Sequence, residues 1–577
     1  MSAAVRRDTL VTDATIVDVI TQSTYRGWFA IQRGRFVEVE AGDAPDERVV
    51  SATEVLDAAG AYVVPGLLDV HMHIESSLVT PRRFAEAVLP WGTTTVLQDP
   101  HEIGNVLGPK GILWMIHAAR GLPLRVLSAI PSCVPATSAE LETPNASITP
   151  DDVVRLAEEP GVVALGEMMD FQGLITGDTH LQGMLAAGAA AGLSLEGHVP
   201  TLTGPDLSRY VAHGIRSDHT LMTPTKLHEQ LRKGLWVMVQ EKSLSSELVD
   251  AVMALRDRSR VLLITDDVMP NRLVGGHMSR LITTAVSLGW DPLDALAAAT
   301  LRPATYLGLD DLGAIAPGKQ ADFLVMDDVT AFPPQLVFRG GERVAEGGRA
   351  RPVAVETPNA PFLASPYRVE HVPAERFALP TGPGEREVRA RVIAVNQVNS
   401  FTTLDERLVH VSDGVPRDDD LALATVIPRA SLVEAAPERL EIGLVSGLGL
   451  ERGAWAATFA HDSHNVFVLG RTPRAMQEAL DALLALGGGM VVVPGDGATP
   501  VSLPLPLAGL LSDEPIDAVA ELFDALEQAL RDAGVGVKHP VLLLTLLPLT
   551  VSPDWKLSDK GVVDVAGRRV LPTLIDA

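Results

Sequence analysis

Histidine and carboxylate residues stand near the ends of several apolar, strand-like segments of this sequence. In PGLLDVHMHIE, His71 and His73 are two residues apart where such a segment ends. Alternate residues of a strand point to the same face, so these two imidazoles can bind one metal ion. An HxH pair also occurs on protein surfaces by chance, and alone it is weak evidence for a metal site.

Four later positions strengthen the metal hypothesis. Glu167 ends VVALGEM, His198 ends LSLEGHV, His219 lies in GIRSDHT and Asp266 lies in VLLITDD. Taken singly, such an aspartate caps a helix and such a histidine belongs to a loop. Together they predict a metal centre at the carboxyl ends of barrel strands, where barrel enzymes bind their substrates.

The elements that must position these residues alternate between strand and helix. Residues 66–313 hold seven or eight such units, as in RVLSAI followed by DDVVRLAEE. This pattern predicts an α/β fold, a TIM-like (β/α)8 barrel of about 250 residues, with a doubly wound open sheet as the alternative.

The remaining segments predict further domains. Residues 1–65 and 314–350 are β-rich, with a hairpin at IQRGRFVEV, and indicate one small β-sandwich domain built from both flanks of the barrel. Residues 351–385 are rich in proline and polar residues and are expected to be a linker. Residues 386–577 have their own helices and strands and are expected to form a C-terminal α/β domain.

The composition of the chain restricts the classes of molecule that it is expected to bind. The 577 residues carry 47 Lys and Arg against 73 Asp and Glu, a net charge of −26, which argues against nucleic acid or an anionic membrane as a partner. The single cysteine, Cys133, excludes internal disulfides and suits the cytoplasm. The pair Arg6-Arg7 precedes no long apolar run, so no signal peptide is expected. We expect a cytoplasmic homo-oligomer with a small-molecule substrate.

The order HxH, Glu, His, His, Asp resembles that of the metal-dependent amidohydrolase superfamily, and so do PGLLDVHMHIE and GAIAPGKQADFLVMD. Further segments resemble adenine deaminases of the bacterial type: HIESSLVTP, GTTTVLQDPHEIGNVLG, ALGEMMDF, GHVPTLTGPDL, HDSHNVFVLG and LPLPLAGLLSDEP. The resemblance covers almost the whole chain, and HEIGNVLG and HDSHN are its most specific parts.

The resemblance implies two divalent metal ions. His71 and His73 would hold one ion with Asp266 beneath it. Glu167 would bridge to a second ion held by His198 and His219. Histidine and carboxylate ligands suit manganese, iron or zinc, and the family favours manganese or iron.

The implied reaction is hydrolytic deamination of adenine to hypoxanthine and ammonia, as in purine salvage, with metal-bound hydroxide attacking C6. Asp266 would take and return the proton. In the segment DPHE, candidates for proton transfer or ring contact are Asp99, His101 and Glu102, with helix capping as the alternative.

Other polar residues are assigned more loosely. Glu75, two residues after His73, is expected on the same face and in contact with a ring nitrogen. Asp267 is expected to support a ligand. His461, Asp462, His464 and Asn465 follow GAWAATFA and suggest another metal site, although a hydrogen-bonded turn or a lid is favoured.

Three departures from the family pattern affect the expected substrate contacts rather than the metal ligands. Thr220 stands where the family usually has Glu, the loop around Ala139 lacks a phenylalanine, and no His-His-Gly precedes GLGLERGA. Another aminopurine or an N6-substituted adenine is therefore the first alternative substrate. A cyclic-amide hydrolase of dihydroorotase or hydantoinase type is less favoured, because the Glu167 bridge, HEIGNVLG and the domain that carries HDSHN favour deamination. A non-enzymatic barrel is also less favoured, because no candidate ligand is missing.

Overall fold

The computed structural model describes residues 8–364, 367–368, 371–396, 401–434, 439–495 and 497–575. The Arg6-Arg7 pair lies outside these residues. The chain forms two compact units. Unit 1 comprises the described residues up to Asp99 with Met115–Ile130 and Val153–Thr357, and unit 2 comprises Pro100–Trp114, Pro131–Asp152 and the residues from Pro358 onward.

Unit 1 contains the predicted barrel. Its parallel strands form two hydrogen-bonded sheets, β10-β9-β8-β7-β6 and β11-β12-β13. The Arg216 N–H donates to the Leu195 carbonyl at 2.9 Å, and the Asp266 N–H donates to the His71 carbonyl at 3.2 Å, which links the two sheets at both margins. The strands are β6 (Leu67–Met72), β7 (Thr93–Gln98), β8 (Arg125–Ile130), β9 (Val162–Met168), β10 (Ser194–Gly197), β11 (Ser217–Asp218), β12 (Trp236–Val239) and β13 (Val261–Leu263).

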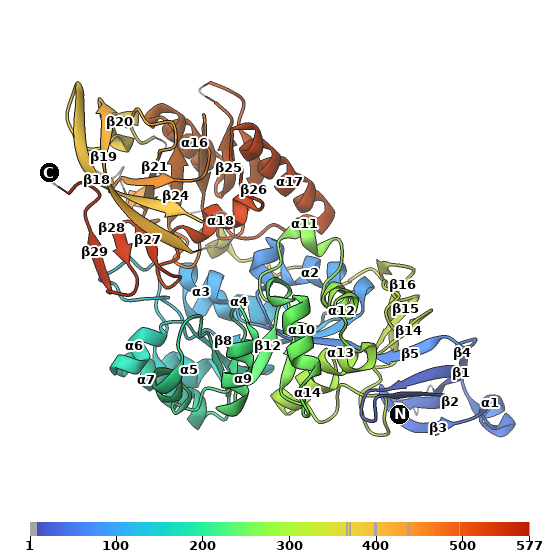
Figure 1. Cartoon of the computed structure of the whole chain (residues 1–577). Coiled ribbons are helices and arrows are strands. Elements are labelled where there is room, and N and C mark those ends of the chain that lie inside the picture. Colours follow the sequence, from blue (N-terminus) through green and yellow to red (C-terminus); the bar gives the residue numbers. More distant parts are fainter. Residues whose placement is uncertain are drawn as a thin grey trace. The chain divides into compact units, whose positions relative to one another are not determined.

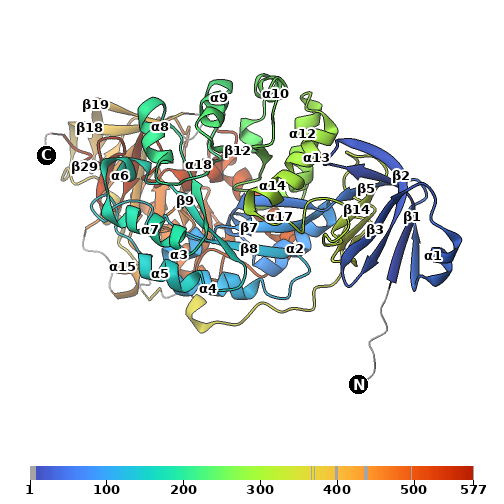
Figure 2. The same cartoon turned by 90° about the horizontal axis from the view of Figure 1, so that it is seen from below.

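Helices cover the outside of these strands. Figure 2 shows α7 beside β9, and Figures 1 and 2 show α9 and α10 near β12. The strands are short and rich in β-branched residues, as in TTTVLQ, and are buried on both faces, as parallel strands between helices must be. Helix α9 begins after Thr223, whose hydroxyl accepts the Lys226 N–H, with Pro224 in the first turn. The helices include α2 (Pro81–Val88), α6 (Phe171–Thr176), α7 (Thr179–Ala190), α8 (Gly204–Val211), α9 (Pro224–Arg232), α10 (Ser246–Met253), α11 (Pro270–Leu273), α12 (Met278–Ser287), α13 (Pro292–Ala298) and α14 (Leu301–Leu307).

Strands from both flanks of the barrel join in one nine-stranded sheet, in the order β17-β16-β15-β14-β5-β1-β2-β3, with β4 beside β1. The predicted hairpin turns at Arg33 and Gly34, which have φ angles of 51° and 75°. Phe29 packs edge-on against Phe323, with ring centroids 5.2 Å apart. The strands are β1 (Asp8–Asp18), β2 (Ser23–Gln32), β3 (Arg35–Ala41), β4 (Glu54–Asp57), β5 (Tyr62–Pro65), β14 (Phe323–Met326), β15 (Leu336–Arg339), β16 (Glu342–Glu346) and β17 (Arg349–Ala350).

Unit 2 is a separate α/β body with a nine-stranded sheet in the order β20-β19-β18-β22-β21-β24-β23-β25-β26 and a smaller sheet β27-β28-β29. Its strands are β18 (Glu385–Val395), β19 (Thr402–Ser412), β20 (Val415–Pro416), β21 (Ala422–Ile427), β22 (Gly443–Ser446), β23 (Ala454–Ala457), β24 (Val466–Gly470), β25 (Gly489–Val493), β26 (Val501–Pro504), β27 (Trp555–Ser558), β28 (Gly561–Asp564) and β29 (Arg569–Leu571). Its helices include α3 (His101–Leu107), α16 (Pro473–Leu486), α17 (Ile516–Asp532) and α18 (Pro540–Leu546).

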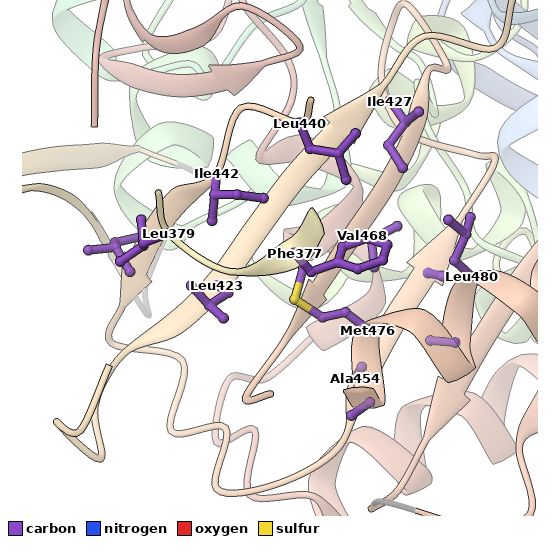
Figure 3. Close-up of a cluster of buried hydrophobic side chains, with 14 of the residues drawn as sticks. Phe377, Leu379, Leu423, Ile427, Leu440, Ile442, Ala454, Val468, Met476 and Leu480 are labelled. Carbon is purple, nitrogen blue, oxygen red and sulfur yellow. The ribbon is translucent and has the colours of Figure 1, made fainter. Parts of the chain in front are cut away.

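Unit 2 differs from the expected C-terminal domain in two respects. Part of the segment expected to be a linker is core, because Val372, Phe377 and Leu379 are buried, and Figure 3 shows Phe377 beside Val468 and Met476. In addition, Pro131–Asp152, expected within the barrel, packs with the C-terminal segment: the Ser558 hydroxyl donates to the Leu141 carbonyl at 2.6 Å. Among the described residues, no helix has both the length and the apolar character that a membrane span requires.

Candidate metal centre and active site

The six predicted metal ligands gather in unit 1 at the carboxyl ends of the barrel strands. We call them the barrel ligand cluster. Five are at most 6% exposed, and the side chain of His198 is about a quarter exposed. The cluster consists of His71 in β6, His73 directly after it, Glu167 in β9, His198 after β10, His219 after β11 and Asp266 after β13.

Glu167 lies at the centre of the cluster. Its Oε2 atom is 2.6 Å from Nδ1 of His198 and 3.1 Å from Nε2 of His219. Its other oxygen, Oε1, is 3.5 Å from Nε2 of His73. The two oxygens of one carboxylate therefore face different histidines, which is the arrangement expected of a ligand shared by two cations.

Hydrogen bonds fix the orientation of two of the histidines. Nδ1 of His73 lies 2.9 Å from the Asp99 carbonyl, which only accepts, so this nitrogen carries a proton and Nε2 is left as the ligand atom. Nε2 of His73 lies 3.4 Å from Oδ1 of Asp266. Nδ1 of His71 lies 3.1 Å from Oε2 of Glu196. A histidine whose other ring nitrogen is bound in this way is typical of metal sites.

The donor set fits a metal. Nε2 of His71 and Nδ1 of His219 are buried and have no hydrogen-bond partner among the described residues. A buried ring nitrogen without a partner is costly unless a bound group such as an ion satisfies it. Ligand atoms of two trios, His71–His73–Asp266 and His71–Glu167–His219, lie within 4.8 Å of one another. Nitrogen and oxygen donors in this mixture suit manganese, iron or zinc.

Asp266 occupies a strained turn. Its φ angle is 60°, in the left-handed region that non-glycine residues seldom adopt, and such positions cluster at functional sites. Its Oδ2 atom lies 3.4 Å from Nζ of Lys242. Burial opposes ionisation, but Lys242 and His73 outweigh it and hold the Asp266 pKa well below its ordinary range. The carboxylate is therefore ionised in the folded protein.

Asp99 supports Glu167 through the backbone. The Glu167 N–H donates to Oδ2 of Asp99 at 3.0 Å. The neighbouring residue must be glycine, because a Cβ on Gly166 would lie 2.0 Å from the same oxygen. This contact gives Asp99 a supporting position beside a ligand. The role predicted for Asp99 from the sequence was proton transfer or contact with the purine ring. Asp267, predicted as a support, accepts a hydrogen bond from the Ser76 hydroxyl.

The prediction that Glu75 continues the strand of His73 was wrong. Strand β6 ends at Met72, and Glu75 lies in the 3-10 helix η1 (Ile74–Ser77), so strand alternation with His73 does not place its side chain. Glu75 is nevertheless fully buried. Thr220, one of the departures from the family pattern, is buried, and its hydroxyl lies 3.0 Å from Oδ1 of Asp218.

In unit 2, the predicted residues Glu102, His461 and His464 come together. Nδ1 of His461 lies 2.8 Å from Oε1 of Glu102, and Nε2 of His464 contacts the other oxygen. Nδ1 of His464 accepts the Ala460 N–H at 3.0 Å, so the ring proton of neutral His464 is on Nε2, which donates to Glu102. These contacts favour the hydrogen-bonded turn over another metal site, since His464 then has no lone pair to offer.

The other members of the unit 2 cluster support the same interpretation. Burial would raise the Glu102 pKa, but His461 and His464 outweigh it and hold this pKa well below its ordinary value. Nε2 of His101 lies 3.4 Å from Oε1 of Glu102, and its Nδ1 lies 3.4 Å from the Cys133 sulfur. Burial would lower the His101 pKa, yet Cys133 and Glu102 raise it above its usual range. Asp462 is also buried in this cluster.

Sequence reasoning missed several residues around the ligands. Glu196, Lys242 and Asp218 contact ligands or their neighbours, and Tyr306 contacts Glu196. Only Glu196 carried a signal: it lies two residues before His198 in a strand that ends at the site. Lys242 and Tyr306 lie on other elements, which only tertiary structure brings to the site.

Comparisons with known proteins show the family to which this chain is similar. The profile of the amidohydrolase family matches residues 62–348, and that of the adenine deaminase C-terminal domain matches residues 399–569. An adenine deaminase of Desulfatibacillum aliphaticivorans is 36% identical over 97% of this chain and 95% of its own length. An adenine deaminase of Methylobacterium sp. is 37% identical over 98% and 97%. The structure of enamidase, an amidohydrolase superfamily member, is 19% identical with a TM-score of 0.46 over 60% of this chain and 97% of its own.

Proposed function

Because the chain belongs to the adenine deaminase family of the amidohydrolases, we propose that it catalyses the hydrolytic deamination of adenine to hypoxanthine and ammonia. The observation that carries this proposal is the position of Glu167, whose two carboxylate oxygens face His73 on one side and His198 with His219 on the other. That arrangement supports a binuclear centre and therefore hydrolytic chemistry.

We propose that His71, His73 and Asp266 hold one divalent cation, that His198 and His219 hold another, and that Glu167 bridges them. Manganese or iron is favoured, with zinc as the alternative. When bound, such ions lower the pKa of coordinated water towards ~7 and so supply hydroxide at neutral pH.

The residues of the chain direct the protons. One water is consumed: its oxygen bonds to C6 of adenine, one of its protons passes to the Asp266 carboxylate, and the other stays with the hypoxanthine product. Asp266 then returns the proton to the exocyclic nitrogen, the C6–N bond breaks, and ammonia leaves. Lys242 and His73 favour the ionised Asp266 that this step needs.

Other assignments remain proposals from the sequence. Glu75 is proposed to contact the purine ring, and His101 and Glu102 are proposed to take part in proton transfer. Asp99 and Asp267 are proposed to support the ligands. The substrate is a purine base, and the homo-oligomeric state and the cytoplasmic location are also expectations.

The test is ammonia release from adenine by protein loaded with manganese. We expect one hypoxanthine and one ammonia per adenine consumed. The variant His73→Gln loses the ligand atom and should lose activity. Its matched control is His180→Gln, on α7 and in none of the contacts described above, which should keep the activity. Metal-loaded protein that releases no ammonia from adenine would overturn the proposal.

A further inference from the structure

A chain of hydrogen bonds behind His71 lies on the side of the ring away from the proposed metals. Nδ1 of His71 lies 3.1 Å from Oε2 of Glu196. The phenol of Tyr306 donates to the other oxygen, Oε1, at 2.8 Å, and the Ser194 hydroxyl donates to the Tyr306 oxygen at 3.3 Å. All of these residues belong to unit 1 and all are buried.

The direction of each hydrogen bond follows from the chemistry of the groups. Burial raises the pKa of Tyr306 well above its ordinary value, so the phenol stays protonated and donates its hydrogen bond to Glu196. Oε2 of Glu196 faces Nδ1 of His71 as an acceptor, so the proton between the two residues resides on Nδ1 of His71. In the neutral ring, Nε2 then carries the lone pair, and this is the buried nitrogen that has no hydrogen-bond partner among the described residues.

We infer that Glu196 and Tyr306 are positioning residues that hold His71 in the tautomer with its proton on Nδ1, so that Nε2 is free to bind metal. This inference rests on the proposed function only in that the barrel ligand cluster binds metal. Substitution of a carboxylate that holds a metal-binding histidine in this way commonly weakens metal affinity by about 10- to 100-fold.

The surroundings keep the chain of hydrogen bonds rigid. Glu196 lies in β10, and Tyr306 lies on α14 with its ring 5.3 Å from that of Trp236, inside a core that also contains Val70. Tyr306 and Glu196 are each 1% exposed. A replaced side chain at either position therefore cannot turn to water for a substitute partner.

Glu196→Gln tests the inference because the amide has a donor end and an acceptor end. Tyr306 continues to donate a proton, so the amide oxygen should face Tyr306 and the amide NH2 should face His71. His71 must then accept at Nδ1 and carry its proton on Nε2, where it blocks the metal. An analogous carboxylate-to-amide change in the serine protease triad disables its histidine through the wrong tautomer.

The decisive variant is the double substitution. In Glu196→Gln with Tyr306→Phe, no phenol holds the amide oxygen, so the amide can turn and accept from Nδ1 of His71. We expect the dissociation constant for Mn²⁺, measured by calorimetry or chelator competition, to rise about 100-fold in Glu196→Gln and only a few-fold in Tyr306→Phe. In the double variant it should return to within about 10-fold of the wild-type value.

The control variants Tyr25→Phe and Glu229→Gln remove a phenol hydroxyl and a carboxylate elsewhere in unit 1 and should leave Mn²⁺ affinity unchanged. Wild-type affinity in Glu196→Gln, or a double variant that binds more weakly than Glu196→Gln, would overturn the inference. Failure of the wild-type protein to bind Mn²⁺ would instead overturn the proposed function. If Glu196→Gln fails to fold, Tyr306→Phe with ¹⁵N NMR of the His71 tautomer provides the test, and a proton on Nε2 in the wild-type protein refutes the inference.

Discussion

Nδ1 of His198 lies 2.6 Å from Oε2 of Glu167, although the two residues are 31 positions apart. Glu167 lies in β9, and His198 directly follows the neighbouring strand β10. Parallel pairing of β9 with β10 brings the carboxyl ends of both strands to one edge of the sheet. The contact therefore follows from the topology, and a carboxylate in this position can be shared between two cations.

Metal content is the first prediction. Protein grown with added manganese should contain close to two transition-metal ions per chain, because the barrel ligand cluster offers six side chains around a shared carboxylate. Prolonged dialysis against a chelator should remove the ions and the deaminase activity, and added Mn²⁺ should restore both. Activity that is indifferent to chelation, in protein without a bound transition metal, would contradict the mechanism.

Glu167→Gln is expected to lose the second ion and to slow turnover by at least ~10²-fold. The amide keeps the shape of the side chain but removes a negative charge between two cations, which is comparable to losing a major electrostatic contribution to catalysis. Metal analysis and kcat for adenine provide the measurement. Glu158→Gln, on an exposed position, serves as the control. Near-normal turnover in Glu167→Gln would show that this carboxylate is not the bridge.

Much of the barrel ligand cluster could be predicted from the sequence because its members follow local patterns. His71, Glu167 and His198 each end a short apolar run, and a run of this kind is visible without any tertiary information. Glu75 could not be placed, because β6 stops at Met72 and the chain turns into a short helix. The contacts of Glu102 with His461 and His464 join residues more than 350 positions apart, and no local pattern indicates them.

The stability of unit 2 against unfolding is expected to depend on pH through Glu142. Burial, with a contribution from the charges of Asp462 and Asp559, raises its pKa from 4.5 to about 8. Between these pH values the folded state holds a proton that the unfolded chain has lost, so the stabilising contribution is complete below pH 4.5 and is lost as the pH rises to about 8. The slope is at most about 1.4 kcal/mol per pH unit.

Glu142→Gln should remove this contribution, because the amide resembles the protonated acid and does not titrate. Thermal unfolding between pH 5 and 8.5 should show the midpoint of the wild-type protein falling with pH more steeply than that of the variant. Glu441→Gln, at a partly exposed position of the same unit, should follow the wild-type curve. Parallel curves for wild type and Glu142→Gln would show that Glu142 is ionised in the folded protein.

Arg429 is expected to be a major stabilising residue of unit 2. It is 5% exposed, and its guanidinium donates to the carbonyls of Ala508 at 2.9 Å, Thr458 at 2.6 Å and His464. Arg429→Met leaves these buried carbonyls without their donors, and we expect a loss of about 3 kcal/mol in the free energy of unfolding. Denaturant unfolding measures it, with Arg439→Met on the surface as the control. An unchanged unfolding midpoint would mean that other donors replace the guanidinium.

Substrate choice is the last prediction. The departures at Thr220 and Ala139 give a reason, from the sequence alone, to expect a high KM for adenine with kcat preserved, and a better rate with another aminopurine. The structure removes much of that reason: the Thr220 hydroxyl lies against Asp218 inside unit 1, and Ala139 is exposed, with its carbonyl bonded to Lys560 in unit 2.

We therefore expect adenine to have the highest kcat/KM in a panel with N6-methyladenine and 2,6-diaminopurine. Thr220→Val keeps the volume and removes the hydroxyl, so it should lower stability through Asp218 while leaving the order of the three substrates unchanged. A wild-type preference for N6-methyladenine would contradict the expected preference for adenine. A substrate order that changes in Thr220→Val would show that Thr220 influences the binding of the purine ring. Both outcomes are read from initial rates of ammonia or methylamine release at several substrate concentrations.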